Sequence, residues 1–174
     1  ILRAGYRGYA EEGTLNKDVK FDTYISAAIK QGLDIGIYFY SQAVSTAEAQ
    51  AEAKYTVNLI KNYKKYITLP VAFDYEFAEV SSGRFDKRWK NKTLNKTKCT
   101  KIATAYCDYI TKAGYDAMVY ANKSFLSEVI DGKTISKTYP IWMANYTTNT
   151  TYSGQFYSWQ FSPTCKISGV SGSV

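Results

Sequence analysis

The sequence predicts an α/β fold in which a largely parallel sheet forms the core of one domain. Short apolar segments typical of strands alternate with longer segments in which apolar residues recur at helical spacing. Glycines and capping residues separate these segments at short intervals. The 174 residues are enough for one domain with a buried core but too few for two comfortable ones. We therefore interpret residues 1–174 as a single domain.

Seven segments have the apolar character and the short length of strands. They are residues 1–6, 35–40, 69–77, 116–121, 140–146, 155–161 and 167–174. A closed barrel of parallel strands has eight strands and typically about 250 residues. The count therefore predicts either an irregular, incomplete barrel or a further strand ahead of Ile1.

Four segments are expected to be helical, and each lies between two predicted strands. They are residues 18–32, 45–63, 98–113 and 125–130. Asp18 is the expected cap of the first helix, and Gly32 is its expected stop. Ser45 and Glu48 have the spacing of a capping box, in which each side chain accepts a hydrogen bond from the other residue's backbone N–H. Because helices alternate with the first strands, we expect right-handed βαβ units and a parallel sheet.

The composition limits the chemistry that the chain can perform. It contains no histidine, which excludes serine–histidine and cysteine–histidine nucleophile systems and histidine-ligated metal sites. Acid–base chemistry must come from carboxylates, tyrosines or lysines. The three cysteines, Cys99, Cys107 and Cys165, form no C-x-x-C pair and so predict no zinc ribbon or redox motif. We expect no metal and no other cofactor.

The charge balance is basic, with 22 Lys and Arg against 15 Asp and Glu, a net charge of +7. Such a surface favours an anionic partner, for example nucleic acid, a membrane surface or a cell-wall polymer. A cluster of basic residues follows the third predicted strand, with Asp86 as its one acid. The cluster consists of Arg84, Lys87, Arg88, Lys90, Lys92, Lys96, Lys98 and Lys101. A solvated loop and helix start is the alternative interpretation, and no apolar run approaches the roughly 20 residues of a membrane span.

The clearest chemical signal lies in residues 69–77, with the sequence LPVAFDYEF. Because strand side chains alternate between faces, Asp74 and Glu76 share one face with Ala72, while the other face is apolar and aromatic. The acids stand at the carboxyl end of the strand, where barrels and α/β sheets place active sites. At about 6.5 Å between Cα atoms, their like charges raise one pKa. One acid can then donate a proton while the other is ionised, which is the division of labour in glycoside hydrolysis.

Two properties of the pair stay open at this point. Either acid could instead pair with a lysine or cap a helix. The carboxyl groups of retaining glycosidases lie about 5–5.5 Å apart and those of inverting ones about 6.5–9.5 Å. Side-chain rotamers of Asp74 and Glu76 could reach either separation, so the spacing does not predict the stereochemical outcome.

Six segments, in order and at family-like spacing, resemble glycoside hydrolase family 25, the Chalaropsis-type muramidases of bacterial autolysins and phage endolysins. They are residues 3–6 (RAGY), 36–41 (GIYFYS, where the family often has G-x-Y-H-F), 69–76 (LPVAFDYE, like L-P-x-x-x-D-x-E), 114–121 (GYDAMVYA), 142–146 (WMANY, like W-x-A-x-Y) and 159–162 (WQFS, like W-Q-Y-S). The resemblance runs through nearly the whole chain.

The resemblance implies an irregular, flattened TIM-like (β/α) barrel with fewer helices than strands. It implies hydrolysis of the β-1,4 bond between N-acetylmuramic acid and N-acetylglucosamine. Glu76 would be the general acid and base. Asp74 would be its charged neighbour, which stabilises positive charge or orients the N-acetyl group of the substrate.

Relative to that family, the chain is expected to begin one strand late and to stop just short of the family's end. Both family segments carry an aspartate. We therefore interpret residues 1–174 as a muramidase-like catalytic domain that is truncated at both ends. The resemblance implies a secreted or wall-associated protein, or a phage protein released at lysis, and no signal peptide is visible at Ile1.

Side chains near the predicted strand ends are candidates for glycan binding, because aromatic faces stack on the CH surfaces of sugars. The candidates are Tyr38, Tyr40, Tyr120, Trp142, Tyr146 and Trp159, and the family resemblance adds Gln160. Core packing is the alternative for each of them. The expected partner is the glycan strand of peptidoglycan. Anionic wall polymer is a second candidate partner. Nucleic acid is not an expected partner.

Three other functions remain as alternatives at this point. The chain could be a non-catalytic glycan-binding or wall-binding relative of the hydrolases. It could be a chitinase-like glycosidase, although Ala72 stands where family 18 enzymes need a further aspartate. A basic nucleic-acid binder would need more aromatic interleaving than Phe85 and Trp89 supply.

Overall fold

One sheet organises the computed structural model, which describes residues 1–80, 83–166 and 168. Within these residues seven strands pair in the order β2-β1-β3-β4-β5-β6-β7. The strands are β1 (Leu2–Arg7), β2 (Leu15–Lys17), β3 (Ile35–Ser41), β4 (Ile67–Tyr75), β5 (Ala117–Asn122), β6 (Ile141–Ala144) and β7 (Ser158–Gln160). Every neighbouring pair is parallel except β1 and β2, which are antiparallel. The expected parallel α/β sheet is confirmed.

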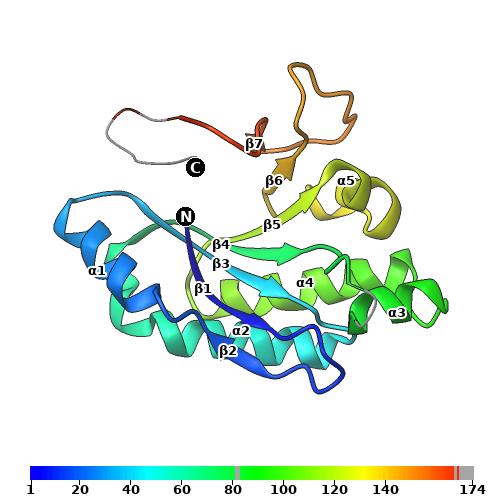
Figure 1. Ribbon diagram of the computed structural model, residues 1–174, viewed down its shortest axis with the longest axis horizontal. Coiled ribbons are helices and arrows are strands. Elements are labelled where there is room, and N and C mark those ends of the chain that lie inside the picture. The colour runs from blue at the N-terminus through cyan, green and yellow to red at the C-terminus, as the bar shows by residue number, and fades with distance from the viewer. Residues whose placement is uncertain (81–82, 167, 169–174) are drawn as a thin grey trace.

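Helices cover one side of this sheet, and α2 and α4 run side by side beneath it (Figure 1). The helices are α1 (Phe21–Lys30), α2 (Thr46–Ile60), α3 (Arg84–Lys90), α4 (Lys96–Lys112) and α5 (Gly132–Ile135). A 3₁₀ helix, η1 (Lys61–Tyr66), extends α2, and a π-helical turn, η2 (Phe125–Val129), follows β5. The described part of the chain thus has fewer α-helices than strands, as in an irregular, flattened TIM-like barrel.

An aromatic core joins the helix-facing side of β4 to the helices. Phe73 and Tyr75 are fully buried, and the ring centroid of Phe73 lies 4.5 Å from that of Tyr106 in α4. The ring of Tyr75 packs against Phe85 of α3 and Phe125 of η2 at 4.9 and 5.3 Å. These contacts confirm that the apolar face of β4 packs under helices, so the face with Asp74 and Glu76 points the other way.

The capping predictions are confirmed in part. Ser45 accepts a hydrogen bond from the Glu48 N–H at 3.2 Å, as the capping box requires. The Glu48 carboxylate accepts from the Val44 N–H instead of returning a bond to Ser45. Asp18 does not cap α1, because the helix begins later, after Lys20. Its carboxylate binds the Lys20 N–H and the Arg3 guanidinium, so it stabilises the turn ahead of the helix.

Several elements differ from the sequence-based expectation. The strand β2 and the helices α3 and α5 were not expected, and the last two predicted strands that the structure describes are shortened to β6 and β7. The predicted strand at residues 167–174 falls outside the described residues except for Ser168. Within the described residues, no helix is long and apolar enough to cross a lipid bilayer.

Candidate functional site

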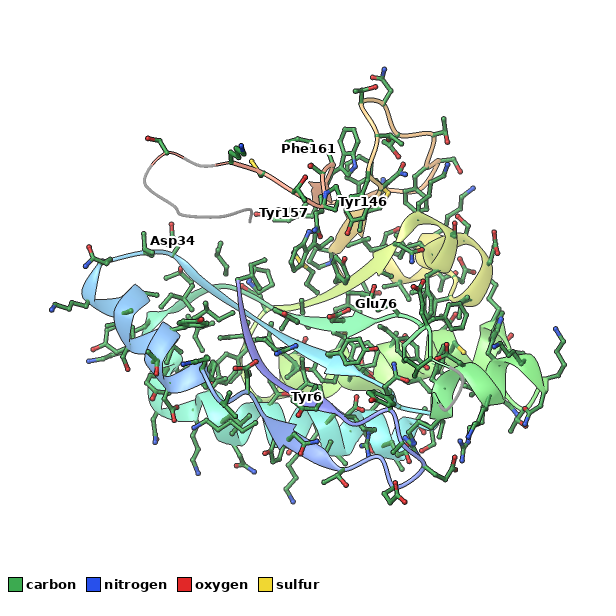
Figure 2. The ribbon with its side chains drawn as sticks, viewed as in Figure 1. Tyr6, Asp34, Glu76, Tyr146, Tyr157 and Phe161 are labelled. Atoms are coloured by element: carbon green, nitrogen blue, oxygen red, sulfur yellow. The ribbon has the colours of Figure 1, made fainter. Side chains whose placement is uncertain are left out.

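The carboxylate pair stands where β4 ends. Asp74 is the penultimate residue of the strand, and Glu76 is the first residue beyond it. Asp74 pairs in register with Tyr40 of β3 on one side and with Tyr120 of β5 on the other. Figure 2 shows Glu76 at this same end of β4. The expected placement of both acids on one face at the carboxyl end of a parallel strand therefore agrees with the structure.

Burial changes the protonation of both acids. Asp74 is only 7% exposed, and its Oδ1 has no hydrogen-bond partner among the described residues. Desolvation raises its pKa well above the ordinary value, the charge of Glu76 raises it further, and Arg3 lowers it. Desolvation and then the charge of Glu79 also raise the pKa of Glu76. Because the two carboxyl groups interact, they titrate as a pair and keep protons to higher pH than isolated acids.

The burial modifies one expectation about the pair. The resemblance assigned the proton to Glu76 and the charge to Asp74. In the unliganded protein the deeper burial of Asp74 favours its neutral form more strongly than that of the half-buried Glu76. The difference arises because desolvation grows with depth, which the alternation of strand side chains does not reveal.

Aromatic side chains from three strands surround Asp74 on the same face. Tyr38 and Tyr40 lie on β3, Tyr120 on β5 and Trp142 on β6, and the strand register aligns them with Ala72 and Asp74. The ring centroids of Tyr120 and Trp142 lie 4.6 Å apart. All four side chains are half-buried, so part of each ring faces solvent. The structure thus brings four of the predicted binding residues to the acid pair.

The remaining three candidates are placed differently. Tyr146 follows β6 and is 50% exposed, and Gln160 lies in register with Ala144 on the face of Trp142. Trp159 lies in register with Met143, which puts it on the opposite face. Its indole N–H donates to the Asn145 carbonyl at 2.8 Å. The adjacent residues Trp159 and Gln160 therefore lie on opposite faces of β7, and the structure places only Gln160 on the face of Trp142.

Two residues of β1 belong to this face although the sequence analysis did not select them. Arg3 lies in register with Tyr38, and Tyr6 with Tyr40. A register shift between Arg3 and Gly5 brings both side chains to one face, and the Arg3 guanidinium lies 5.6 Å from the Tyr6 ring centroid. The available signal was that Arg3 is the one charged residue of the predicted strand at residues 1–6. The irregular register hid its consequence.

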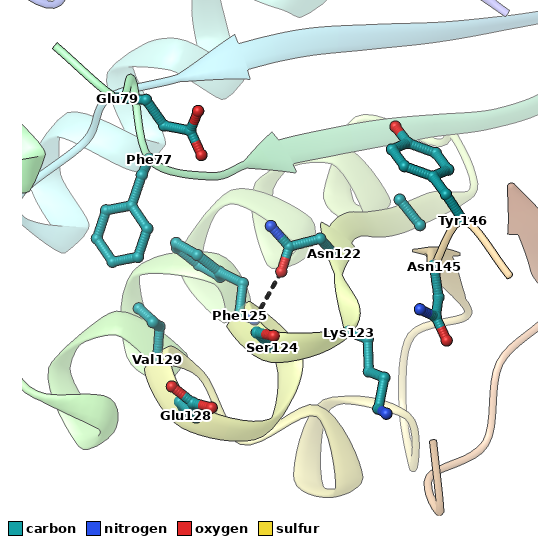
Figure 3. Close-up of a pocket in the computed structure, with 11 residues that line it drawn as sticks. Phe77, Glu79, Asn122, Lys123, Ser124, Phe125, Glu128, Val129, Asn145 and Tyr146 are labelled. Atoms are coloured by element: carbon teal, nitrogen blue, oxygen red, sulfur yellow. Dashed lines mark hydrogen bonds between the residues drawn. The ribbon is translucent and has the colours of Figure 1, made fainter. Parts of the chain in front are cut away.

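A hollow of about 580 Å³ opens where the chain leaves the carboxyl ends of β4, β5 and β6, and its lining begins at Phe77, without Asp74 and Glu76 (Figure 3). Phe77 and Glu79, which directly follow the pair, form one wall, and Asn145 and Tyr146 belong to the opposite one. Asn122, Lys123, Ser124, Phe125, Glu128, Val129 and Ala144 complete the lining. The hollow combines charged, amide and aromatic groups, which suits a polar ligand with apolar faces.

Metal chemistry and thiol chemistry find no support in this arrangement. In the described part of the chain, no group of three or more acidic, cysteine or histidine side chains could hold a metal ion. All three cysteines are free, and Cys99 and Cys107 are buried. Burial raises the pKa of Cys99 to about 11, so its thiol is not reactive near neutral pH.

Comparisons with solved structures identify the fold. The modular autolysin LytC from Streptococcus pneumoniae is 26% identical with a TM-score of 0.78, and the alignment covers 99% of this chain and 38% of LytC. The spore cortex lytic enzyme SleM from Clostridium perfringens is 20% identical with a TM-score of 0.77, over 99% of this chain and 57% of SleM. A family 25 glycosyl hydrolase from Bacillus anthracis is 21% identical with a TM-score of 0.72, over 98% and 71%.

The chain spans well under two thirds of the length of LytC and of SleM. No curated protein matches it. The family model for glycosyl hydrolases family 25 matches residues 9–170. Together with the acid pair at the end of β4 and the shared fold, this match over most of the sequence shows that the chain belongs to glycosyl hydrolases family 25.

Proposed function

We propose that this protein is a peptidoglycan hydrolase, a lysozyme of the muramidase type. It cleaves the β-1,4 bond between N-acetylmuramic acid and N-acetylglucosamine. The observation that carries the proposal is the pair Asp74 and Glu76, two acids with raised pKa values among half-exposed aromatic rings in a family 25 chain. A structure of LytC with a synthetic peptidoglycan ligand supports the substrate class.

In this mechanism Glu76 donates its proton to the glycosidic oxygen, and the bond from that oxygen to the anomeric carbon breaks. Glu76 takes this role because it is the more accessible acid of the pair. Asp74 acts as a carboxylate, after its proton has passed to solvent water ahead of bond cleavage, and it stabilises the positive charge that develops on the sugar ring or orients the N-acetyl group. Water then adds to the anomeric carbon, and the Glu76 carboxylate accepts the proton that this water releases.

The aromatic side chains of the acid face would bind the sugar rings. Tyr38, Tyr40, Tyr120 and Trp142 line the floor around Asp74. Tyr146, half exposed at the edge of the hollow, would contact the neighbouring sugar, and Gln160 would add a hydrogen bond. Trp159 would not contact the sugar but would hold the main chain of Asn145, which lines the hollow.

Digestion of purified peptidoglycan tests the proposal. Wild-type protein is expected to release fragments with N-acetylmuramic acid at the reducing end, identified by mass spectrometry after borohydride reduction. Glu76→Gln should lower the rate by at least about 100-fold, because general acid–base catalysis contributes roughly 10²–10⁴-fold. Asp74→Asn should also lower the rate strongly, whereas Glu12→Gln changes an exposed carboxylate in the loop after β1 and should have no effect.

The result of Glu76→Gln decides between the proposal and its main alternative. Equal digestion by wild type and Glu76→Gln would refute the catalytic assignment. Binding to peptidoglycan without release of sugars would indicate a non-catalytic glycan-binding relative. Reducing ends that carry N-acetylglucosamine instead would refute the proposed bond specificity.

We further propose that the exposed lysines near α3 contact anionic wall polymer, at the wall of the cell where a secreted or lysis-released enzyme would act. Of the basic cluster, Arg84 is buried against Glu48, and Arg88 pairs with Glu11. The exposed charges are Lys87, Lys90, Lys92, Lys96, Lys98 and Lys101. They form a basic surface that a polyanion can neutralise.

Sedimentation with cell walls measures this contact. The triple variant Lys87→Gln/Lys90→Gln/Lys92→Gln should bind walls that contain teichoic acid less tightly than wild type, and the difference should shrink in high salt. The matched control Lys30→Gln/Lys54→Gln/Lys61→Gln removes the same charge from α1, α2 and η1 and should bind like wild type. Equal loss in both variants would attribute the effect to net charge and contradict a defined surface.

A further inference from the structure

The main chain of Glu76 lies beyond the hydrogen-bonded ladder of the sheet. The last register pair between β3 and β4 is Ser41 with Tyr75, and the last pair between β4 and β5 is Asp74 with Tyr120. Neither neighbouring strand therefore fixes the residue that carries the proposed proton donor. A backbone carbonyl at such a place needs another partner if its residue is to keep one position.

The side chain of Gln42 supplies that partner. Gln42 directly follows β3 and is fully buried. Its Nε2 donates to the Glu76 carbonyl at 3.1 Å, to the Tyr40 hydroxyl at 3.2 Å and to the Ser41 carbonyl at 3.0 Å. One amide therefore connects the proton donor to an aromatic residue of the same face.

The main chain of Gln42 is held by the ion pair between Arg84 and Glu48. The Arg84 Nη1 donates to the Gln42 carbonyl at 2.9 Å, and the same guanidinium binds both carboxylate oxygens of Glu48 at 2.8 and 2.7 Å. Arg84 is 4% exposed. A bidentate pair of this kind fixes direction as well as distance, so the backbone of Gln42 has little freedom to move.

The chain after Glu76 is held by a side chain of α3. The Asp86 carboxylate accepts from the Ala78 N–H at 3.0 Å and from the Glu79 N–H at 3.2 Å. Glu79 has φ +56°, a left-handed conformation that a side chain other than glycine adopts only when its surroundings hold it there. The main chain of residues 76–79 is thus held at Glu76 by Gln42 and at Ala78 and Glu79 by Asp86.

The chemistry of the Gln42 side chain indicates that it does more than fill space. Its Oε1 is buried without a hydrogen-bond partner among the described residues. A buried acceptor without a partner costs stability, so an apolar side chain of the same length would serve packing better. The presence of an amide side chain at position 42 is therefore explained by the hydrogen bonds that its Nε2 donates, and not by the space that the side chain fills.

We propose that Gln42 is a positioning residue for the glycosidase reaction, which holds Glu76 and the Tyr40 hydroxyl in one reactive arrangement. This inference rests on the proposed function. Gln42 does not touch the reacting atoms. It acts through the main chain of Glu76, and a small displacement of a proton donor is enough to cost a large part of the rate.

The test compares kinetics and stability of Gln42→Met, which keeps length and removes the donor. We expect kcat on solubilised peptidoglycan strands to fall about 10–100-fold, with KM changed less than about twofold. The midpoint of thermal unfolding should change little, since the unpaired Oε1 is removed too.

Thr56→Val is the matched control. It removes a buried hydroxyl of α2 that accepts a hydrogen bond from the Tyr106 hydroxyl. This variant should lower the unfolding midpoint and leave kcat unchanged.

The outcomes separate this inference from the proposed function. If Glu76→Gln is as active as wild type, the proposed function fails first. If Glu76→Gln is inactive and Gln42→Met keeps kcat within about twofold of wild type, the positioning role is wrong while the function stands. Gln42→Leu, which also removes the donor, is the second variant and should show the same fall in kcat. If neither variant folds, the assigned side-chain amide protons of Gln42 in wild type decide: slow exchange with solvent supports the hydrogen bonds, and exchange at the solvent rate overturns them.

Discussion

Glu79 is the residue whose charge raises the pKa of the proposed proton donor, Glu76. Its carboxylate lines the hollow beside β4, and its charge is the second cause, after desolvation, of the raised pKa of Glu76. In Glu79→Gln this charge is absent, so Glu76 should lose its proton at lower pH. We expect the alkaline limb of the kcat/KM profile on peptidoglycan to move to lower pH, because the acid must be protonated to act.

A control from the same hollow tests the electrostatic origin of this shift. Glu128 lines the hollow from η2 but is not among the charges that raise the pKa of Glu76. Glu128→Gln should therefore leave the alkaline limb in place. Equal shifts in both variants would point to a general effect of charge in the hollow, and no shift in Glu79→Gln would contradict the coupling.

At the scale of single residues, the sequence predicted the positions that follow from strict alternation. Asp74 and Glu76 share a face because β4 is regular from Val71 to its end, and Tyr120 and Trp142 join them through the parallel register. Arg3 was missed because β1 shifts its register after that residue. The faces of Trp159 and Gln160 were not predicted, because a motif of adjacent residues does not state which one points inward.

At the scale of elements, helices with an apolar stripe were predicted and α3 was not. Its sequence, RFDKRWK, is mostly charged, and the residues that it buries include Arg84 and Asp86. These two side chains are stabilised by the main chain of Gln42, Ala78 and Glu79, which are distant or irregular in the sequence. A short helix whose buried face combines Phe85 with two charged residues has no clear hydrophobic period, so its existence depends on tertiary partners.

Two glycines with positive φ allow a prediction about turn elements. Gly32 ends α1 at φ +64° with no atom within 4 Å of an added Cβ, whereas Gly13, at φ +55°, would place a Cβ 2.8 Å from Arg84 Cζ. Gly32→Ala should lower the free energy of unfolding by about 1–2 kcal/mol, the usual cost of a left-handed residue with a Cβ. Gly13→Ala should cost clearly more, because it also displaces the guanidinium that holds Gln42.

Urea unfolding of both glycine variants measures the difference. Because both substitutions add one methyl group to a residue in the same backbone region, Gly32→Ala is the control for backbone strain alone. The excess loss in Gly13→Ala then reports the contact with Arg84. Equal losses would mean that the Arg84 side chain moves aside without cost.

At the scale of the whole molecule, the parallel sheet was predictable and its edges were not. Strand–helix alternation and the first four apolar segments predict β1, β3, β4, β5 and the helices between them. The antiparallel strand β2 is only three residues long, and its segment LNK has no alternation to detect. Short edge strands are defined by their neighbour and not by their own pattern, which also explains why β7, at the other edge, is shorter than expected.

The buried carboxyl groups together predict how the stability of the molecule depends on pH. Asp74, Glu76 and Glu52 have raised pKa values, and that of Glu52 rises to about 7 through its complete burial. Between about pH 5 and 7 the native state therefore holds protons that the unfolded chain has released. The free energy of unfolding should fall over this range by about 1.4 kcal/mol per pH unit for each such proton.

Carboxylates with lowered pKa values limit the stability of the protein at acidic pH. The pKa values of Asp18, Glu48 and Asp131 are lowered by hydrogen bonds and basic neighbours that outweigh any desolvation, so their contribution is lost as the pH falls below about 4. Stability measured by urea unfolding from pH 3 to 8 should thus be greatest at mildly acidic pH. Asp74→Asn removes one carboxyl group with a raised pKa. The free energy of unfolding should then fall less steeply toward pH 7 and be higher at pH 7 than in wild type. Glu12→Gln, which changes an exposed carboxylate, should leave the pH dependence of stability unchanged. A stability that increases from pH 5 to 7 would contradict the burial of these acids.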